Sequence, residues 1–415
     1  MLMKRGYRRL KQKRMFSVIL VALIFAELLY MVTLLNEGKS ITGIDSLVCV
    51  LKTYLVPVIF VMIDILYIIT LGQPFMYDKY SKKLLQAGMF NGVIEPPCLV
   101  SDTKITSGDY KDCERLVFES PGFSIKNWED NQGQITSALN RIVLNVSQGD
   151  YANQFNLIIA GEGALLPNKI NWDDNYITGD DSEYVVGIAL PNRIVSYDCD
   201  KEPMVAICGT TGSGKSNLVR TQVYQAIKKE VKVYLIDLKR GVDYGMFYKQ
   251  NCTCLFKIEE INLTLKDVVS EMMHRYDLFS RTNGVTNIVD YRAQGGKMQR
   301  ILVVVDELAQ VTETRGVPKA TKEILEQIND SIVKISQLGR ASGITLLVAG
   351  QRLDQNTFPG QLRSNINVRI CGKADENLSI VVYGDRRADE LVPKNIRGRF
   401  MLEDKTLFQA FYIEK

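Results

Sequence analysis

Two long apolar runs come first in the pattern of hydrophobic and polar positions along the chain. Residues 16–35 contain one acid, Glu27, and residues 54–71 contain only Asp64. At about 1.5 Å per residue, each run is long enough to cross a bilayer as a helix. A signal peptide is the competing interpretation of the first run, but no small-residue cleavage site follows it and a second apolar run does. The pattern therefore predicts two transmembrane helices over residues 16–71, joined by a short loop on the far side of the membrane.

The pattern between this hairpin and residue 203 is mixed. Residues 140–146 and 155–160 are short apolar runs typical of strands, and residues 172–183 form an acidic stretch with turn signals. No set of residues with catalytic spacing occurs here. We expect residues 72–203 to form a smaller α/β or β-rich domain next to the membrane.

From residue 204 onward, short runs rich in Val and Ile alternate with segments of helical periodicity. Runs that are apolar throughout suit strands buried on both faces, so this alternation predicts an α/β fold with a mostly parallel sheet. Ligands of such sheets bind at the carboxyl ends of the strands. The expected strands are residues 231–236, 301–305, 344–349 and 368–371, and the expected helices lie within residues 263–281 and 319–338.

Charge and composition predict where the flanks of the hairpin lie and argue against several kinds of catalytic and metal site. Lys79, Lys82 and Lys83 follow the second apolar run, and a basic tail over residues 1–15 precedes the first, which predicts that both flanks are cytoplasmic. The eight cysteines are scattered without zinc spacing and are expected to be reduced thiols. A single histidine, His274, argues against Ser-His-Asp hydrolysis and His-based metal sites. The basic tail residues are Lys4, Arg5, Arg8, Arg9, Lys11, Lys13 and Arg14.

Residues 204–216, MVAICGTTGSGKS, join an apolar run to a glycine-rich turn that ends in Lys-Ser. This spacing fits the P-loop pattern, in which glycines let backbone N–H groups close around phosphates. Lys215 then meets the β- and γ-phosphates, the Ser216 hydroxyl suits Mg²⁺, and the following helix directs its positive end at the phosphates. The sequence therefore predicts binding of a nucleoside triphosphate. The predicted binding residues are Gly209, Thr210, Thr211, Gly212, Ser213, Gly214, Lys215, Ser216 and Asn217.

Residues 301–307, ILVVVDE, supply the second half of such a site. A buried strand that ends in Asp306 places a carboxylate near the metal, so Ser216 and Asp306 are the predicted Mg²⁺ ligands. The next residue, Glu307, can orient or deprotonate the attacking water. A polar residue on the neighbouring strand can contact the γ-phosphate, and Gln351 is our choice for that sensor. Lys215, Asp306, Glu307 and Gln351 are therefore the predicted catalytic residues.

The chain contains, in this order, the segments GTTGSGKS, MMHRYDLF, NIVDY, VVVDELA, GRASGITLLVAGQR and LRSNINVRI. Together, and in this order, they resemble the FtsK/SpoIIIE DNA translocases over about residues 185–415. The resemblance implies a RecA-like ATPase motor over residues 204–415 that uses ATP and Mg²⁺, assembles as a hexameric ring and moves double-stranded DNA through its pore. Arg340 and Arg369 lie in family-like motifs, and either could act on the γ-phosphate of a neighbouring subunit.

The overall plan of the chain differs from that of the chromosome-segregating members of this family. Those members usually have more transmembrane spans and a further DNA-reading module. It is more similar to coupling ATPases of conjugative plasmids and integrative elements in Gram-positive bacteria. That likeness implies a relaxase and membrane-channel components as partners and a bacterial cell membrane as location. The alternatives are a protein-export ATPase similar to those of type VII secretion and a nucleotide-gated scaffold that does not hydrolyse. Two basic clusters either contact DNA or are solvated surface charge: Arg292, Lys297 and Arg300, and Lys394, Arg397 and Arg399.

Overall fold

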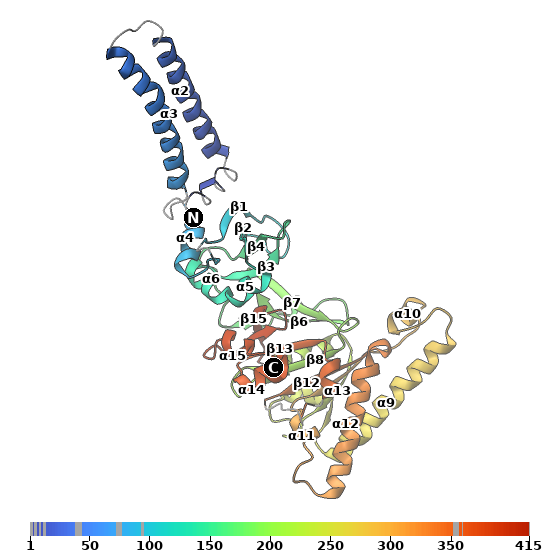
Figure 1. The fold of residues 1–415 in the computed structure, drawn as a ribbon. Coiled ribbons are helices and arrows are strands. Elements are labelled where there is room, and N and C mark those ends of the chain that lie inside the picture. Colours follow the sequence, from blue (N-terminus) through green and yellow to red (C-terminus); the bar gives the residue numbers. More distant parts are fainter. Residues whose placement is uncertain are drawn as a thin grey trace. The chain divides into compact units, whose positions relative to one another are not determined.

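A computed structural model describes most of the chain, which divides into two compact units, Met1–Ala164 and Leu165–Lys415 (Figure 1). The described residues are 3, 6–7, 10, 14–37, 44–71, 77–92, 95–351, 357–358 and 360–414. The predicted basic residues Lys4, Arg5, Arg8, Arg9, Lys11 and Lys13, and Arg352 of the GRASGITLLVAGQR segment, lie outside them.

Helices α2 (Arg14–Glu37) and α3 (Ile44–Leu71) form the predicted apolar hairpin and run side by side in Figure 1. The rings of Tyr30 and Phe60 meet edge to face at 5.9 Å, and the Tyr67 hydroxyl donates to the Phe16 carbonyl. Within these helices, Met15–Thr33 and Tyr54–Leu71 are long and apolar enough to cross a membrane.

The rest of the first unit is a small antiparallel sheet covered by short helices, as expected for a β-rich domain. Trp128 is fully buried, and its ring lies 5.4 Å from that of Phe118 and 5.8 Å from that of Phe155. These aromatic contacts form the centre of a core separate from that of the second unit. In sheet order the strands are β1 (Cys98–Lys104), β2 (Glu114–Glu119), β4 (Gln154–Ile159) and β3 (Val143–Gln148), and the helices are α4 (Lys79–Gln86), α5 (Ile125–Asp130) and α6 (Gln132–Leu139).

The second unit is built on the predicted mostly parallel sheet. Strand β12 lies between β11 and β8, and β8 is followed by β13, all parallel. Every residue of β8, β11 and β12 is buried, because helices cover both faces. The parallel strands, in order, are β10 (Thr253–Leu255), β9 (Lys232–Ile236), β11 (Ile301–Val305), β12 (Ile344–Gly350), β8 (Met204–Cys208) and β13 (Val368–Cys371).

Antiparallel strands extend this sheet beyond β13. They are, in order, β14 (Arg399–Leu402), β15 (Leu407–Tyr412), β6 (Glu183–Ala189) and β7 (Arg193–Asp198), and the short β5 (Ile170–Asn171) pairs parallel to β15. Two reversals of direction, at β14 and at β15, make β15 parallel to β8 again. The carboxyl ends of β5, β8 and β15 therefore lie at the same edge of the sheet.

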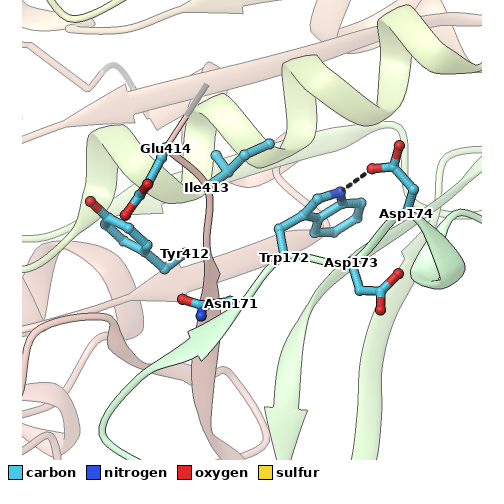
Figure 2. Close-up of a pocket in the computed structure, with 7 residues that line it drawn as sticks. All are labelled: Asn171, Trp172, Asp173, Asp174, Tyr412, Ile413 and Glu414. Carbon is cyan, nitrogen blue, oxygen red and sulfur yellow. Dashed lines mark hydrogen bonds between the residues drawn. The ribbon is translucent and has the colours of Figure 1, made fainter.

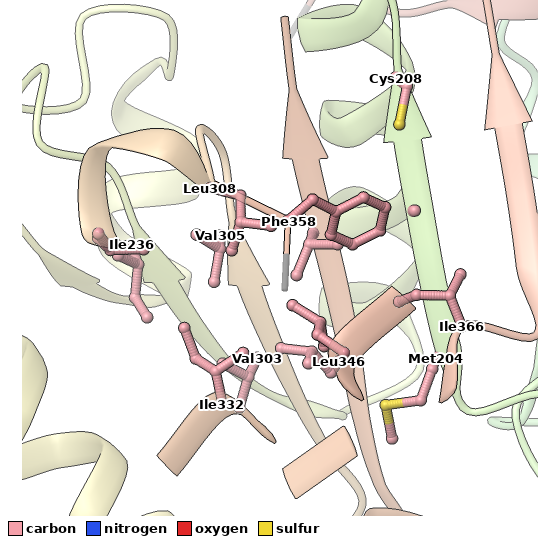
Figure 3. Packing of buried hydrophobic residues seen from close by; sticks show 14 of the residues in the cluster. Met204, Cys208, Ile236, Val303, Val305, Leu308, Ile332, Leu346, Phe358 and Ile366 are labelled. Atoms are coloured by element: carbon pink, nitrogen blue, oxygen red, sulfur yellow. The ribbon is translucent and has the colours of Figure 1, made fainter. Parts of the chain in front are cut away.

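Two helical layers enclose the sheet. On one face α9 (Ile258–Arg281) and α12 (Lys319–Ser342) lie side by side, which confirms both predicted helices (Figure 1). Figure 3 shows Ile332 of α12 packed with Val303, Leu346 and Phe358 in this core. The other face is covered by α7 (Lys215–Lys228). The shorter helices are η3 (Asp174–Tyr176), α8 (Met246–Asn251), α10 (Ile288–Ala293), α11 (Ala309–Thr312), α13 (Gly360–Asn365), α14 (Glu376–Tyr383) and α15 (Arg387–Leu391).

The second unit begins earlier than the boundary predicted at Met204. Strands β6 and β7, which precede that boundary, continue the large sheet through the pairing of β6 with β15. The pairing joins segments such as Ala189 and Phe408 that are distant in sequence. A local hydrophobic pattern carries no information on such a partner, which explains the difference.

Two arginines of the first basic cluster have a structural role. Arg300 is buried and forms ion pairs with Asp181 at 2.8 Å and Asp200 at 2.7 Å, while Arg292 also pairs with Asp181 at 2.8 Å. Burial alone would raise the pKa of Asp181, but hydrogen bonds from Arg300 and Arg292 outweigh it and lower that pKa. Arg300 is therefore neither a DNA contact nor a solvated charge, and with Arg292 it ties the segments on either side of β6 and β7 to the start of β11. Lys297, the third basic residue of this cluster, is exposed.

Candidate nucleotide-binding site

The loop between β8 and α7 has backbone angles that require glycine. Gly212 and Gly214 have φ of 82° and 100°, in the left-handed region. A Cβ at Gly214 would lie only 2.9 Å from the backbone nitrogen of Gly398, and one at Gly209 would lie 2.6 Å from Ser213 Oγ. The glycine spacing therefore permits a tight turn whose backbone a phosphate can approach.

Residues far along the chain support this loop. The backbone N–H and the hydroxyl of Thr210 both donate to the Lys373 carbonyl, at 2.8 and 3.0 Å. The Gly398 N–H donates to the Ser213 carbonyl at 2.8 Å, and the Ser213 hydroxyl is buried without a hydrogen-bond partner among the described residues. The loop is thus held from the side of β13 and β14, and an unsatisfied polar atom remains inside it.

Lys215 and the end of β11 meet as the sequence predicts. The Lys215 side chain is 3% exposed, and its Nζ donates to the Asp306 carbonyl at 3.0 Å and lies 3.9 Å from Glu307 Oε2. A buried ammonium beside a carboxylate at the carboxyl edge of the sheet provides the charge that a β,γ-phosphate group requires.

The Asp306 carboxylate is almost fully buried. Its Oδ1 accepts a hydrogen bond from the Tyr244 hydroxyl at 3.1 Å, and its Oδ2 has no hydrogen-bond partner among the described residues. Burial raises the pKa of Asp306, with the charge of Lys215 opposing it and that of Asp237 adding to it. A buried carboxylate oxygen without a partner among the described residues suits a hard cation such as Mg²⁺, and Ser216, in the first turn of α7, is the second ligand predicted from the sequence.

Gln351 links the two halves of the site. Its backbone N–H donates to Glu307 Oε1, and its side-chain oxygen accepts from the Thr211 hydroxyl, both at 3.0 Å. Glu307 is therefore held between Lys215 and Gln351 at the ends of three adjacent strands. The predicted neighbours Lys215, Asp306, Glu307 and Gln351 are brought together.

Asn217 has a different environment from the other predicted loop residues. Its side-chain amide donates to the Ile413 carbonyl at 2.8 Å and its side-chain oxygen accepts from the Ile413 N–H at 3.3 Å. The side chain thus fastens the first turn of α7 to the end of β15. Its backbone N–H already donates to Gly214.

The two candidate trans-acting arginines differ in how firmly they are held. Arg369 donates to Glu403 and to the carbonyls of Val382 and Arg363, and its ion pair with Glu403 measures 3.2 Å. Arg340 is exposed at the end of α12 and donates to one carbonyl, that of Asp200. Arg340 is the guanidinium that a neighbouring molecule can reach more readily.

The second basic cluster also contains residues that are held by partners and one that is exposed. Arg399 is buried and bonds Gln409 and nearby carbonyls, and Lys394 pairs with Asp389 at 2.6 Å. Arg397 is exposed, and its Cγ lies 3.6 Å from the position of a Cβ at Gly214. The sequence left Arg397 open between a DNA contact and a solvated surface charge, and the structure places it beside the phosphate loop.

Comparisons with known proteins agree with this geometry. Residues 180–355 match the model of the FtsK/SpoIIIE family. The DNA translocase FtsK of Oceanobacillus iheyensis is 31% identical over 255 residues, 54% of this chain and 31% of the relative. The DNA translocase FtsK of Chlorobaculum tepidum is 34% identical over 222 residues, 48% of this chain and 26% of the relative. The chain thus spans less than a third of the length of these relatives.

One solved structure is similar over a larger share of the chain. The conjugation coupling protein TcpA of pCW3, in its monomer form with ATPγS, is 29% identical and superposes with a TM-score of 0.60. The match covers 81% of this chain and 95% of that chain. The similarity therefore extends beyond the segment that the family model matches.

Proposed function

Because residues 180–355 match the model of the FtsK/SpoIIIE family, we propose that this chain is an ATP hydrolase that moves DNA, and that it delivers relaxase-bound DNA to a conjugative transfer channel. The observation that carries the proposal is the meeting of Lys215, Glu307 and Gln351 at the ends of adjacent strands. The likeness to TcpA over nearly all of that coupling protein supports the conjugative role.

In this proposal the loop backbone and Lys215 bind the phosphates of ATP. Ser216 and Asp306 would hold Mg²⁺, which supplies charge neutralisation at the β- and γ-phosphates when bound. Glu307 orients the attacking water and accepts its proton, since Lys215 and the Gln351 N–H fix the carboxylate at the γ-phosphate end of the site. Gln351, bonded to Thr211, contacts the γ-phosphate and transmits its loss to the loop.

Two further features support hydrolysis in an assembly rather than passive binding. A scaffold that only binds nucleotide does not require a carboxylate positioned like that of Glu307. The proposed ring partner is a second copy of this chain, and Arg340 is the exposed arginine available to act on its neighbour's γ-phosphate.

We propose that the hairpin of α2 and α3 spans the bacterial cell membrane twice, with both termini in the cytoplasm. Its apolar side chains are exposed along both candidate spans, which suits lipid and not water. The chain should therefore stay in the membrane pellet during alkaline carbonate extraction, which strips peripheral proteins. Release into the supernatant would contradict the anchoring.

ATP turnover by the full chain in detergent is expected to rise with double-stranded DNA. Contacts to phosphates release counterions, so the DNA concentration needed for half-maximal stimulation should increase steeply with salt, by a log–log slope of about 0.9 per contact. Turnover measured with duplex DNA, single-stranded DNA and polyglutamate over a salt series tests this. Polyglutamate, a polyanion without DNA geometry, should have no effect. Lack of stimulation by either DNA would favour protein export or a scaffold.

A further inference from the structure

The Asp306 carboxylate, a predicted Mg²⁺ ligand, is held by a tyrosine from the turn after a neighbouring strand. Tyr244 is buried, and its hydroxyl lies 3.1 Å from Asp306 Oδ1. Among the described residues no other group donates to this carboxylate, and its Oδ2 has no hydrogen-bond partner. One oxygen is therefore held by Tyr244, while the other is left for a ligand.

The backbone of Asp306 does not by itself decide which carboxylate oxygen is held. Its N–H donates to the Ile236 carbonyl at 3.1 Å, and its own carbonyl accepts from Lys215 Nζ at 3.0 Å. These contacts fix the main chain, but the terminal torsion of an aspartate side chain has a broad energy minimum. A donor to Oδ1 narrows that torsion and orients Oδ2, as hydrogen bonds to ligating carboxylates do in metal sites generally.

A tight turn after β9 brings Tyr244 to the end of β11. The two strands are neighbours, so Asp237 and Asp306, which follow them, lie at the same edge of the sheet. The buried Asp237 carboxylate accepts from the backbone N–H groups of Lys239 at 2.9 Å and Gly241 at 2.8 Å. The Tyr244 N–H then donates to the Gly241 carbonyl at 3.1 Å. The turn therefore directs the tyrosine back toward the strand ends.

A row of aromatic rings packs against the Tyr244 ring. The row begins at Trp172, which donates to Asp174 as Figure 2 shows, and the Tyr224 hydroxyl donates to the same carboxylate. The row joins Tyr244 to α8 and α7, so the ring is fixed by packing independently of its hydroxyl. After Trp172 the rings are, each measured from the one before, Tyr224 at 6.1 Å, Phe247 at 5.4 Å, Tyr248 at 5.5 Å and Tyr244 at 5.7 Å.

We infer that Tyr244 is a positioning residue for ATP hydrolysis, whose hydroxyl holds the Asp306 carboxylate so that Oδ2 is available to the Mg²⁺ that accompanies the triphosphate. The inference rests on the proposed function, because it concerns a ligand of the same metal. Tyr244 acts through Asp306 and not on the phosphates or the attacking water. Loss of its hydroxyl should therefore weaken the contribution of Mg²⁺ to nucleotide binding and leave binding without metal unchanged.

The gain in ATPγS affinity that Mg²⁺ gives measures this contribution without turnover. Calorimetric titrations of the full chain in detergent, with excess EDTA and with excess Mg²⁺, give two dissociation constants whose ratio is the gain. Tyr244→Phe keeps the ring and removes the hydroxyl. It should reduce the gain by about 10- to 100-fold, the usual cost in metal affinity of losing a hydrogen-bond partner of a metal ligand. The dissociation constant in EDTA should not change.

Tyr248→Phe is the matched control, because it removes the hydroxyl of the neighbouring buried tyrosine in the same aromatic row. That hydroxyl has no hydrogen-bond partner among the described residues, so the gain should stay at the wild-type value. A thermal melt of each variant checks that it is folded. A wild-type gain in a folded Tyr244→Phe chain would overturn the inference, as would an equal loss in Tyr248→Phe.

A double-mutant cycle tests whether Tyr244 acts through Asp306. In an Asp306→Ala background the carboxylate is absent, so adding Tyr244→Phe should change the gain by less than about 2-fold. An equal reduction in both backgrounds would overturn the positioning role. A wild-type chain that binds ATPγS no more tightly with Mg²⁺ than with EDTA would overturn the proposed metal site itself, and the inference with it.

Discussion

Replacing Glu307 by Gln is expected to abolish ATP turnover while ATP remains bound. The amide keeps the shape of the side chain and can still accept from the Gln351 N–H, but it cannot take a proton from water. Loss of a positioned general base typically lowers kcat by about 10²- to 10⁴-fold. The ion pair with Lys215 at 3.9 Å is also lost, which leaves the lysine free to serve the phosphates.

Phosphate release and nucleotide retention, measured on the same sample, check this result. Glu326→Gln makes the same chemical change on the exposed side of α12, where Glu326 pairs with Lys322 at 3.8 Å, and should turn over ATP like the wild type. Near-normal phosphate release by Glu307→Gln would remove Glu307 from its assigned role.

Replacing Lys215 by Ala is expected to abolish ATP binding itself. The ammonium is 3% exposed, so its charge acts on the phosphates with little screening by water. Truncating one partner of a buried charge pair costs about 2–5 kcal/mol, which corresponds to about a 30- to 5,000-fold loss of affinity. Turnover should be undetectable.

Binding of a fluorescent ATP analogue at equilibrium measures the loss, with a thermal melt to show that the variant is folded. Lys322→Ala is the matched control, because that lysine lies on the exposed side of α12 and should leave affinity unchanged. A folded Lys215→Ala variant with wild-type affinity would refute the assignment of the phosphate loop. The two variants also separate binding from chemistry, since only Glu307→Gln should retain the nucleotide.

Local sequence patterns predicted which residues meet at the strand ends, but not the residues that support them. The phosphate loop, Asp306 and Glu307 are recognisable because their chemistry depends on short spacing and on the ends of apolar strands. Gln351 could be assigned to the strand beside them by the same reasoning. The pairings in the sheet confirm that β12 separates β11 from β8.

Supports that come from distant parts of the chain gave no local signal. Lys373 and Gly398 contact the loop through backbone atoms, which any residue type possesses. The Tyr244 hydroxyl, in the segment after β9, donates to Asp306. Nothing in the neighbouring sequence distinguishes this tyrosine from the others in the chain. Arg300 was misread because a basic residue near glycines resembles a surface loop until Asp181 and Asp200 are seen beside it.

The support of the phosphate loop by much later residues also sets an order of events during synthesis. A ribosome makes the loop and α7 well before Gly398 and Ile413, which hold Ser213 and Asn217. A nascent chain that has reached only α7 therefore carries a loop without these two supports. The loop receives them only after β14 and β15 have been made and have joined the sheet.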